Sequence, residues 1–168
     1  MRFLHLADLH LGRTVNEYRL IEDQEYILKE ILSIAEEKQA DAVVIAGDVY
    51  DKSIPSEEAV RLLDWFLSEL AKRQIAVILI AGNHDSDVRL DFGSAFFTAR
   101  NVFITGSYQG AVNCITLQDE FGDVCFWSLP FVKASHVLHY HNMYMFYLLK
   151  LLPYQVPHYE LFQHEILL

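Results

Sequence analysis

Three short polar motifs hold the residue types in this chain that could do chemistry. They are Asp8-Leu9-His10, Gly47-Asp48-Val49-Tyr50-Asp51 and Gly82-Asn83-His84-Asp85. Carboxylate, amide and imidazole groups of this kind suit divalent metal ions and do not suit a hydrophobic core. If the fold brings the three motifs together, they predict a metal site.

The first two motifs have spacings that fit metal ligands. Asp8 and His10 are two positions apart, so in extended backbone both side chains project from one face, about 7 Å apart at the backbone. Asp48 follows Gly47, whose missing Cβ lets the backbone approach a ligand closely. The two oxygens of Asp48 could bridge two ions about 3.5–4 Å apart. Alternatively, the polar residues of these two motifs have structural roles in helix caps and turns. We favour such a structural role for Asp51.

The third motif combines a neutral oxygen donor with an imidazole. Asn83 supplies an amide oxygen directly after an apolar run, and His84 is either a ligand or a proton donor. Asp85 could fix the tautomer of His84 and raise its pKa. The alternative is a simple Asn-His turn. Since all three motifs follow strand candidates in succession, we favour one shared metal site over three unrelated turns.

The elements that must position these residues alternate along the chain. Apolar, strand-like runs at residues 3–7, 42–46 and 75–81 each end in one of the motifs, and helical patterns at 23–38 and 57–72 lie between them. This order predicts a parallel α/β sheet with right-handed crossovers and helices on both faces. Such sheets bind ligands outside the carboxyl ends of their strands.

The helical patterns also predict which side chains are buried. The stripe expected in the first helix consists of Tyr26, Ile27, Ile31, Ile34 and Ala35. The second helix, with Ser56 as its N-cap, should bury Val60, Leu63, Phe66, Leu67 and Leu70.

Shorter elements are expected after Asp85. They are a helix over 89–98 and strands over 102–105, 111–117 and 124–129, with a hairpin turn at 119–122 and an antiparallel or mixed sheet. Cys114 and Cys125 could lie across this hairpin, but two cysteines make no disulfide framework. We therefore predict buried free thiols.

Composition narrows the class of protein. A chain of 168 residues with 52% hydrophobic and 21% charged residues suits one folded domain and excludes a disordered chain. Its longest apolar stretch, 143–152, contains Lys150 and is too short to span a membrane, and polar residues interrupt any signal-like start. We therefore expect a cytoplasmic protein without membrane association. The net charge of −10 disfavours a broad nucleic-acid surface but leaves phosphodiester substrates open.

The three motifs, in this order and spacing, resemble the opening motifs of the calcineurin-like metallophosphoesterases: D-x-H, G-D-x-x-D and G-N-H-D. The surrounding residues, such as Leu4-His5-Leu6-Ala7 before Asp8 and Ala81 and Ser86 around the third motif, resemble SbcD-type nuclease subunits of bacterial DNA repair complexes. The resemblance covers roughly residues 1–132.

This resemblance implies a layered fold, with a mostly parallel central sheet flanked by helices and antiparallel strands later in the chain. It implies two divalent ions, Mn²⁺ in most of the family. Asp8 and His10 would bind the first ion, Asp48 both, and Asn83 the second. His84 would act on the phosphate, with Asp85 orienting it. The implied activity is exonuclease and endonuclease cleavage of DNA, and the implied partners are DNA and an SbcC-type ATPase subunit.

The chain departs from the family pattern in its last part. The family completes its site with a Gly-His and a Gly-His-x-His motif, but the last glycine here is Gly122. His136, His139 and His141 could form a substitute metal site, although a structural role is the stronger interpretation. We therefore expect residues 1–132 to be the N-terminal part of a nuclease domain. Residues 133–168 would be an atypical tail rich in aromatic residues and histidine, produced by truncation or a frameshift.

Two other functions remain open from the sequence. One keeps the fold but changes the substrate to a phosphoprotein or a small phosphoester. The other is a non-catalytic binding or assembly module, which the missing motifs favour. An exposed aromatic tail would also favour a homodimer or aggregation.

Overall fold

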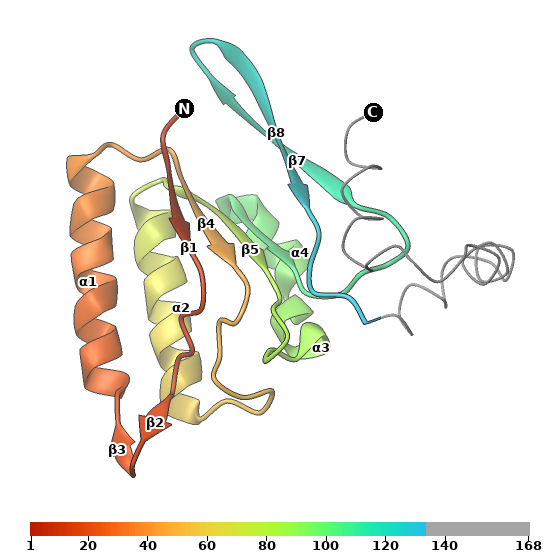
Figure 1. Cartoon of the computed structure of the whole chain (residues 1–168). Coiled ribbons are helices and arrows are strands. Elements are labelled where there is room, and N and C mark those ends of the chain that lie inside the picture. Colours follow the sequence, from red (N-terminus) through yellow and green to blue (C-terminus); the bar gives the residue numbers. More distant parts are fainter. Residues whose placement is uncertain (134–168) are drawn as a thin grey trace, which may run out of the picture. The chain divides into compact units, whose positions relative to one another are not determined.

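A four-stranded parallel sheet forms the centre of the fold. The computed structural model describes residues 1–133, and Met1–Val132 form one compact unit. Strands β1 (Phe3–Leu6), β4 (Ala42–Ala46), β5 (Ala76–Ile80) and β6 (Val102–Thr105) lie side by side in that order (Figure 1). All three pairings are parallel, so the carboxyl ends of the strands share one edge of the sheet. This confirms the predicted α/β class.

The two faces of the sheet have different neighbours. Val43 of β4 and Val77 of β5 are paired in register, and both belong to the core that includes helices α1 (Ile21–Glu37) and α2 (Glu57–Lys72). On the opposite face, Phe3 is 51% exposed, and its ring meets Phe126 edge to face with centroids 5.7 Å apart. Helices flank the sheet, as the predicted fold class states. At β1 the second face is contacted by an aromatic side chain from a later strand.

Helix α1 buries a stripe that only partly matches the predicted one. Ala35 is buried as predicted and Ile31 is partly buried. Tyr26, Ile27 and Ile34 are exposed, and Leu28 and Leu32 are buried in their place. Both stripes have helical spacing, so the periodicity of this leucine- and isoleucine-rich segment does not choose between them. Contact with α2 and the sheet chooses Leu28 and Leu32, which join the main core.

Helix α2 begins and ends where the sequence predicts. The Ser56 hydroxyl accepts a hydrogen bond from the Ala59 N–H at 3.3 Å, which is the expected N-cap. Leu63, Phe66 and Leu70 are buried as predicted, and Leu67 is half-buried. Val60 is 44% exposed, so that prediction is wrong, and Leu62 is buried in its place.

Several shorter elements lie between the strands of the sheet along the chain. A small antiparallel pair, β2 (Thr14–Val15) and β3 (Tyr18–Arg19), lies between β1 and α1 in the chain. The single helix predicted over 89–98 is broken into α3 (Asp87–Asp91), α4 (Ser94–Phe97) and the 3-10 turn η1 (Thr98–Arg100). The break is at Gly93, whose φ of +78° is left-handed and cannot continue a helix.

The last described strands form a separate antiparallel hairpin, β7 (Asn113–Asp119) and β8 (Gly122–Ser128). A disulfide joins Cys114 to Cys125 across it, and Cys125 is exposed, so the predicted buried free thiols are wrong. The β pairing puts Cys125 opposite Thr116, two residues from Cys114, and this diagonal neighbour is close enough to bond. None of the described helices is both long and apolar enough to cross a membrane.

Candidate metal centre

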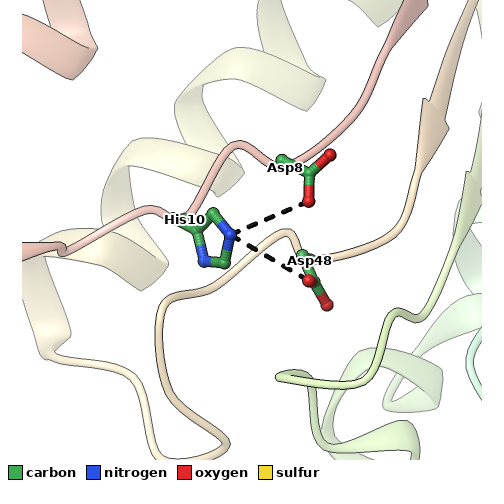
Figure 2. A group of neighbouring side chains, drawn as sticks. All are labelled: Asp8, His10 and Asp48. Carbon is green, nitrogen blue, oxygen red and sulfur yellow. Dashed lines mark ion pairs between the residues drawn. The ribbon is translucent and has the colours of Figure 1, made fainter.

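Asp8, His10 and Asp48 come together beyond the carboxyl ends of β1 and β4 (Figure 2). The Nε2 atom of His10 lies 3.8 Å from Oδ1 of Asp8 and 4.0 Å from Oδ2 of Asp48. The side chains of His10 and Asp48 are only 17% and 12% exposed, whereas that of Asp8 is 71% exposed. The cluster is therefore anchored on its inner side and open to solvent at Asp8.

Backbone hydrogen bonds hold the first two motifs against each other. Past the end of the sheet, the Asp8 N–H donates to the Gly47 carbonyl at 3.2 Å and the His10 N–H to the Asp48 carbonyl at 2.9 Å. The Leu11 N–H then donates to the Val49 carbonyl at 2.9 Å. These bonds continue the parallel pairing of β1 with β4 into the loops. They fix the spacing between the loop that carries Asp8 and His10 and the loop that carries Asp48.

The three clustered residues share an uncommon backbone conformation. Their φ angles are +55° at Asp8, +44° at His10 and +48° at Asp48, all in the left-handed region. Extended backbone was expected at Asp8 and His10, and that prediction is wrong. Left-handed conformations of residues other than glycine cost of order 1 kcal/mol and concentrate at functional sites. Here the cost is borne by all three residues whose side chains converge.

The loop that follows β5 (the β5 loop) also lies against the loop that follows β4 (the β4 loop). The His84 N–H donates to Oδ1 of Asp48 at 3.0 Å. A Cβ on Gly82 would lie 2.1 Å from Oδ1 of Asp48, and one on Gly47 would lie 2.9 Å from the Cα of Gly82. Only glycine fits at these two positions, so the glycines of the second and third motifs let the loops touch.

Asn83 lines the same hollow as Asp8 and Asp48, the two carboxylates of the cluster. The hollow is lined by residues of all three motifs and by Phe131, whose N–H donates to the Ala81 carbonyl at 2.8 Å. Asp8, Asp48 and Asn83 are among its lining residues. The structure thus places the four predicted ligands, Asp8, His10, Asp48 and Asn83, around one region at the edge of the sheet.

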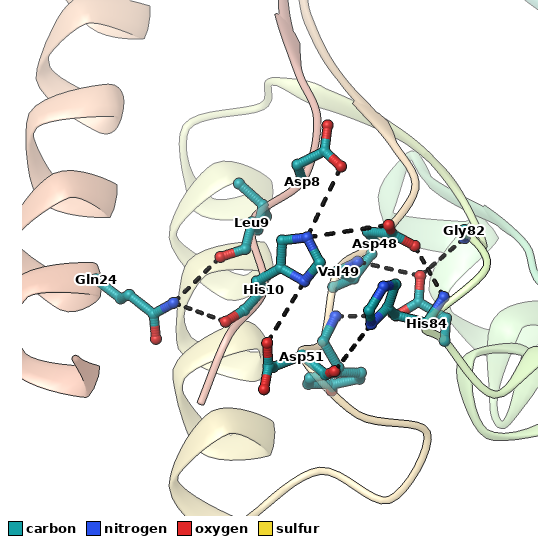
Figure 3. A network of polar contacts seen from close by, with 11 residues as sticks. Asp8, Leu9, His10, Gln24, Asp48, Val49, Asp51, Gly82 and His84 are labelled. Carbon is teal, nitrogen blue, oxygen red and sulfur yellow. Dashed lines mark hydrogen bonds and ion pairs between the residues drawn. The ribbon is translucent and has the colours of Figure 1, made fainter. Parts of the chain in front are cut away.

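His84 lies beside His10, and both contact Asp51. The two imidazole rings are perpendicular, with centroids 4.9 Å apart. Nδ1 of His84 is 3.2 Å from the Asp51 carbonyl, and Nδ1 of His10 is 3.7 Å from Oδ1 of Asp51 (Figure 3). Since a carbonyl only accepts, Nδ1 of His84 carries the hydrogen and Nε2 is left for proton exchange. Asp51 thus contacts both histidines. The structural turn role predicted for Asp51 did not include these contacts.

Asp85 has a different role from the predicted one. Its carboxylate accepts hydrogen bonds from the backbone N–H groups of Val49, Tyr50 and Gly82 at 3.1, 2.9 and 2.8 Å. It therefore joins the β4 loop to the β5 loop, and the group that meets the His84 ring is the Asp51 carbonyl. Burial and the nearby Asp85 charge raise the pKa of the Tyr50 phenol to about 12.

The donor atoms fit a divalent ion. Ligand atoms at about 2.0–2.2 Å from one ion lie at most about 4.4 Å apart. The atoms offered by Asp8, His10 and Asp48 all lie within 4.8 Å of one another, so a small movement of side chains would close the set. Nδ1 of His10 is buried and makes no hydrogen bond to the described residues. A hydrogen on Nδ1, facing the Asp51 carboxylate, would leave Nε2 as the ligand atom.

Two residues beside this centre were not predicted to contact it. Asp51 was given a structural turn role, although it contacts both histidines. Gln24, whose Nε2 donates to the His10 carbonyl at 2.8 Å, had no signal in the sequence because it belongs to no motif. The predicted substitute ligands His136, His139 and His141 lie outside the described residues.

The comparison with known families agrees with the fold and the cluster. The family model described as calcineurin-like phosphoesterase matches residues 1–166. Members of this family hydrolyse phosphoesters with divalent metals, which fits the carboxylate and imidazole donors at the end of β1 and β4. The chain therefore belongs to the calcineurin-like phosphoesterase family.

Proposed function

We propose that this chain hydrolyses phosphodiester bonds of DNA, as the nuclease subunit of an SbcCD-like repair complex that includes an SbcC-type ATPase. The cluster of Asp8, His10 and Asp48 next to Asn83 carries the hydrolytic part of this proposal. We propose DNA as the substrate because the residues that flank the three motifs resemble those of SbcD-type subunits.

Each residue of the site would have one task. Asp8 and His10 would hold one divalent ion, Asp48 would bridge two, and Asn83 would hold the second. When bound, such ions activate water and neutralise charge on the phosphate. We propose Mn²⁺ as the ion, from the resemblance alone. The exposed His84 ring has its Nδ1 hydrogen directed at the Asp51 carbonyl, which leaves Nε2 to act on the phosphate. With a second proton on Nε2, the ring would stabilise charge on the phosphate or give that proton to the leaving oxygen and return to the neutral form.

Among the described residues, this site offers few ligands per ion. Three residues whose ligand atoms cluster and one asparagine would serve two ions between them. We therefore expect weak Mn²⁺ binding and slow cleavage. Micromolar binding of two Mn²⁺ ions per chain, with robust DNA cleavage that His84→Ala abolishes, would overturn that expectation.

The test compares two substrates with the full 168-residue chain. A 5′-labelled single-stranded oligonucleotide and p-nitrophenyl phosphate are incubated with 1 mM MnCl₂, with and without EDTA. We expect slow, EDTA-sensitive cleavage of the oligonucleotide that Asp48→Asn removes. Hydrolysis of p-nitrophenyl phosphate alone would favour the phosphatase alternative.

A matched variant makes a negative result informative. Asp64→Asn makes the same chemical change at an exposed position of α2 and should cleave like the unchanged chain. If neither substrate is cleaved although Mn²⁺ binds, the non-catalytic alternative is supported instead. If Asp48→Asn cleaves as well as Asp64→Asn, the activity comes from a contaminant and the assignment of the site fails.

A further inference from the structure

Gln24 in the first turns of α1 contacts the loop that carries Asp8 and His10, and we propose that it is a positioning residue for the metal centre. This inference rests on the proposed metal-dependent function. Gln24 lies outside all three motifs, and its side chain ends at the backbone of the loop.

Both ends of the Gln24 amide form hydrogen bonds to this loop. Its Nε2 donates to the His10 carbonyl at 2.8 Å and to the Leu9 carbonyl at 3.2 Å (Figure 3). Its Oε1 accepts from the Gly12 N–H at 2.9 Å. The two carbonyls require the nitrogen, and the N–H group requires the oxygen. The orientation of the amide is therefore fixed by its partners.

These contacts tie the backbone of His10 to helix α1. The His10 N–H is bound to the Asp48 carbonyl, and the His10 carbonyl is bound to Gln24 and also to the Arg13 N–H at 3.1 Å. Both backbone polar groups of His10 are thus tied at a left-handed φ of +44°. Because the direction of the imidazole follows from this backbone, Gln24 helps to set the distances from Nε2 to Asp8 and Asp48.

Helix α1 provides a rigid base for this contact. One turn after Gln24, Leu28 is 2% exposed, and Leu32 is 4% exposed in the same core. The backbone N–H of Gln24 is itself bound to the Leu20 carbonyl at 2.8 Å. Because α1 is anchored in the core, it holds the Gln24 amide in a fixed position next to the loop that carries Asp8 and His10. Groups that position ligands from outside the coordination shell often change metal affinity tenfold or more when they are lost.

Two substitutions separate the positioning role from simple folding. Gln24→Glu has the same shape but places a carboxylate against two carbonyl oxygens and removes both donors. Gln24→Met keeps the length of the side chain and removes all three hydrogen bonds. Gln39→Glu, at an exposed position after the end of α1, is the matched control because it adds the same charge.

The experiment measures Mn²⁺ affinity by electron paramagnetic resonance, together with amide hydrogen exchange and the melting temperature of the metal-free chain. We expect Gln24→Glu and Gln24→Met to weaken Mn²⁺ binding about tenfold or more and to speed exchange of the Gly12 amide. Gln39→Glu should bind Mn²⁺ within twofold of the unchanged chain. If Gln24→Glu does not fold, Gln24→Met decides the question.

Several outcomes would overturn the proposal. A lower melting temperature with unchanged Mn²⁺ affinity would show that Gln24 only stabilises the fold. Unchanged affinity despite faster exchange of Gly12 would show that the loop does not need Gln24 to place its ligands. Because affinity is measured without substrate, a chain that binds Mn²⁺ through Gln24 but cleaves no phosphoester overturns the proposed function alone. A chain that binds no Mn²⁺ overturns both.

Discussion

Gly82 shows how a single residue allows two loops of the site to meet. Its backbone needs no left-handed φ, but a Cβ there would lie 2.1 Å from Oδ1 of Asp48 and 2.2 Å from the Asp48 nitrogen. The role of this glycine is therefore space for the carboxylate and for the β4 loop. Loops that touch through glycine cannot tolerate even one methyl group without moving apart.

We expect Gly82→Ala to weaken Mn²⁺ binding at least tenfold, because the added methyl group displaces Asp48. Gly93→Ala is the control. Its φ of +78° also disfavours alanine, but its Cβ would meet only the Phe97 ring at 3.5 Å or more, away from the motifs. Gly93→Ala should cost about 1 kcal/mol of stability and leave the affinity unchanged. Isothermal titration with MnCl₂ checks both. Equal affinities in the two variants would contradict the steric role of Gly82.

Tyr50 gives a prediction in the alkaline range. Burial, the Asp85 charge and the Asp64 charge raise its pKa to about 12. A raised pKa means that the folded state holds the proton more tightly than the unfolded state. The contribution to stability is therefore complete below about pH 10, the unfolded pKa of tyrosine, and is lost as the pH rises toward 12. When the folded chain is titrated with base, absorbance at 295 nm should show a tyrosine ionisation step near pH 12. Tyr50→Phe should remove this step.

The control for this titration is Tyr18→Phe, since Tyr18 is 71% exposed. That variant should keep the step near pH 12. A Tyr50→Phe difference spectrum centred near pH 10 would show that Tyr50 ionises as it does in solution. The packing around Tyr50 and Asp85 would then be wrong.

At the scale of elements, the strands were easier to predict than the packing of the helices. Residues 42–46 and 102–105 match β4 and β6 because short apolar runs end at polar or glycine positions. The stripe of α1 was misplaced because Ile27 and Leu28 are equally apolar, and only the neighbouring α2 and sheet distinguish them. Tertiary contact settles what helical periodicity leaves open.

The same distinction explains what could be predicted of the site. The types of Asp8, His10 and Asp48 indicate metal binding, and the order of the strands indicates that they meet. The left-handed backbone of all three could not be predicted, since it depends on hydrogen bonds between the two loops. The partners of Asp85 are backbone N–H groups, which leave no trace in the sequence of the residues that supply them.

Helix α2 supports a stability prediction that tests its buried face. Phe66 is fully buried in the core shared with the sheet, whereas Val60, one of the residues predicted to be buried, is 44% exposed. Phe66→Ala should lower the free energy of unfolding by about 3–5 kcal/mol, because it leaves a cavity in the core. Val60→Ala should change it by less than about 1 kcal/mol. Urea unfolding followed by circular dichroism measures both, and a larger loss for Val60→Ala would contradict the orientation of α2.

At the scale of the whole molecule, metal binding and folding should be linked. The four predicted ligands follow three different strands, β1, β4 and β5, so an ion held by them would bind the folded chain and not the unfolded one. Such binding stabilises the fold according to the ratio of free ion to dissociation constant. The size of this stabilisation therefore indicates how tightly the ion is bound, and so how many of its ligands the chain supplies.

We expect 1 mM MnCl₂ to stabilise the full chain by about 1–2 kcal/mol, as follows from a dissociation constant of about 0.1 mM. That corresponds to a rise of about 2–8 °C in melting temperature, measured by differential scanning fluorimetry. Asp48→Asn should remove most of the rise, because Asp48 contacts both neighbouring loops and offers the bridging carboxylate, while Asp64→Asn should keep it. A rise that survives Asp48→Asn would place the bound ion elsewhere in the molecule. A rise corresponding to 4 kcal/mol or more would mean a dissociation constant near 1 μM. Residues beyond the four predicted ligands would then have to complete the coordination.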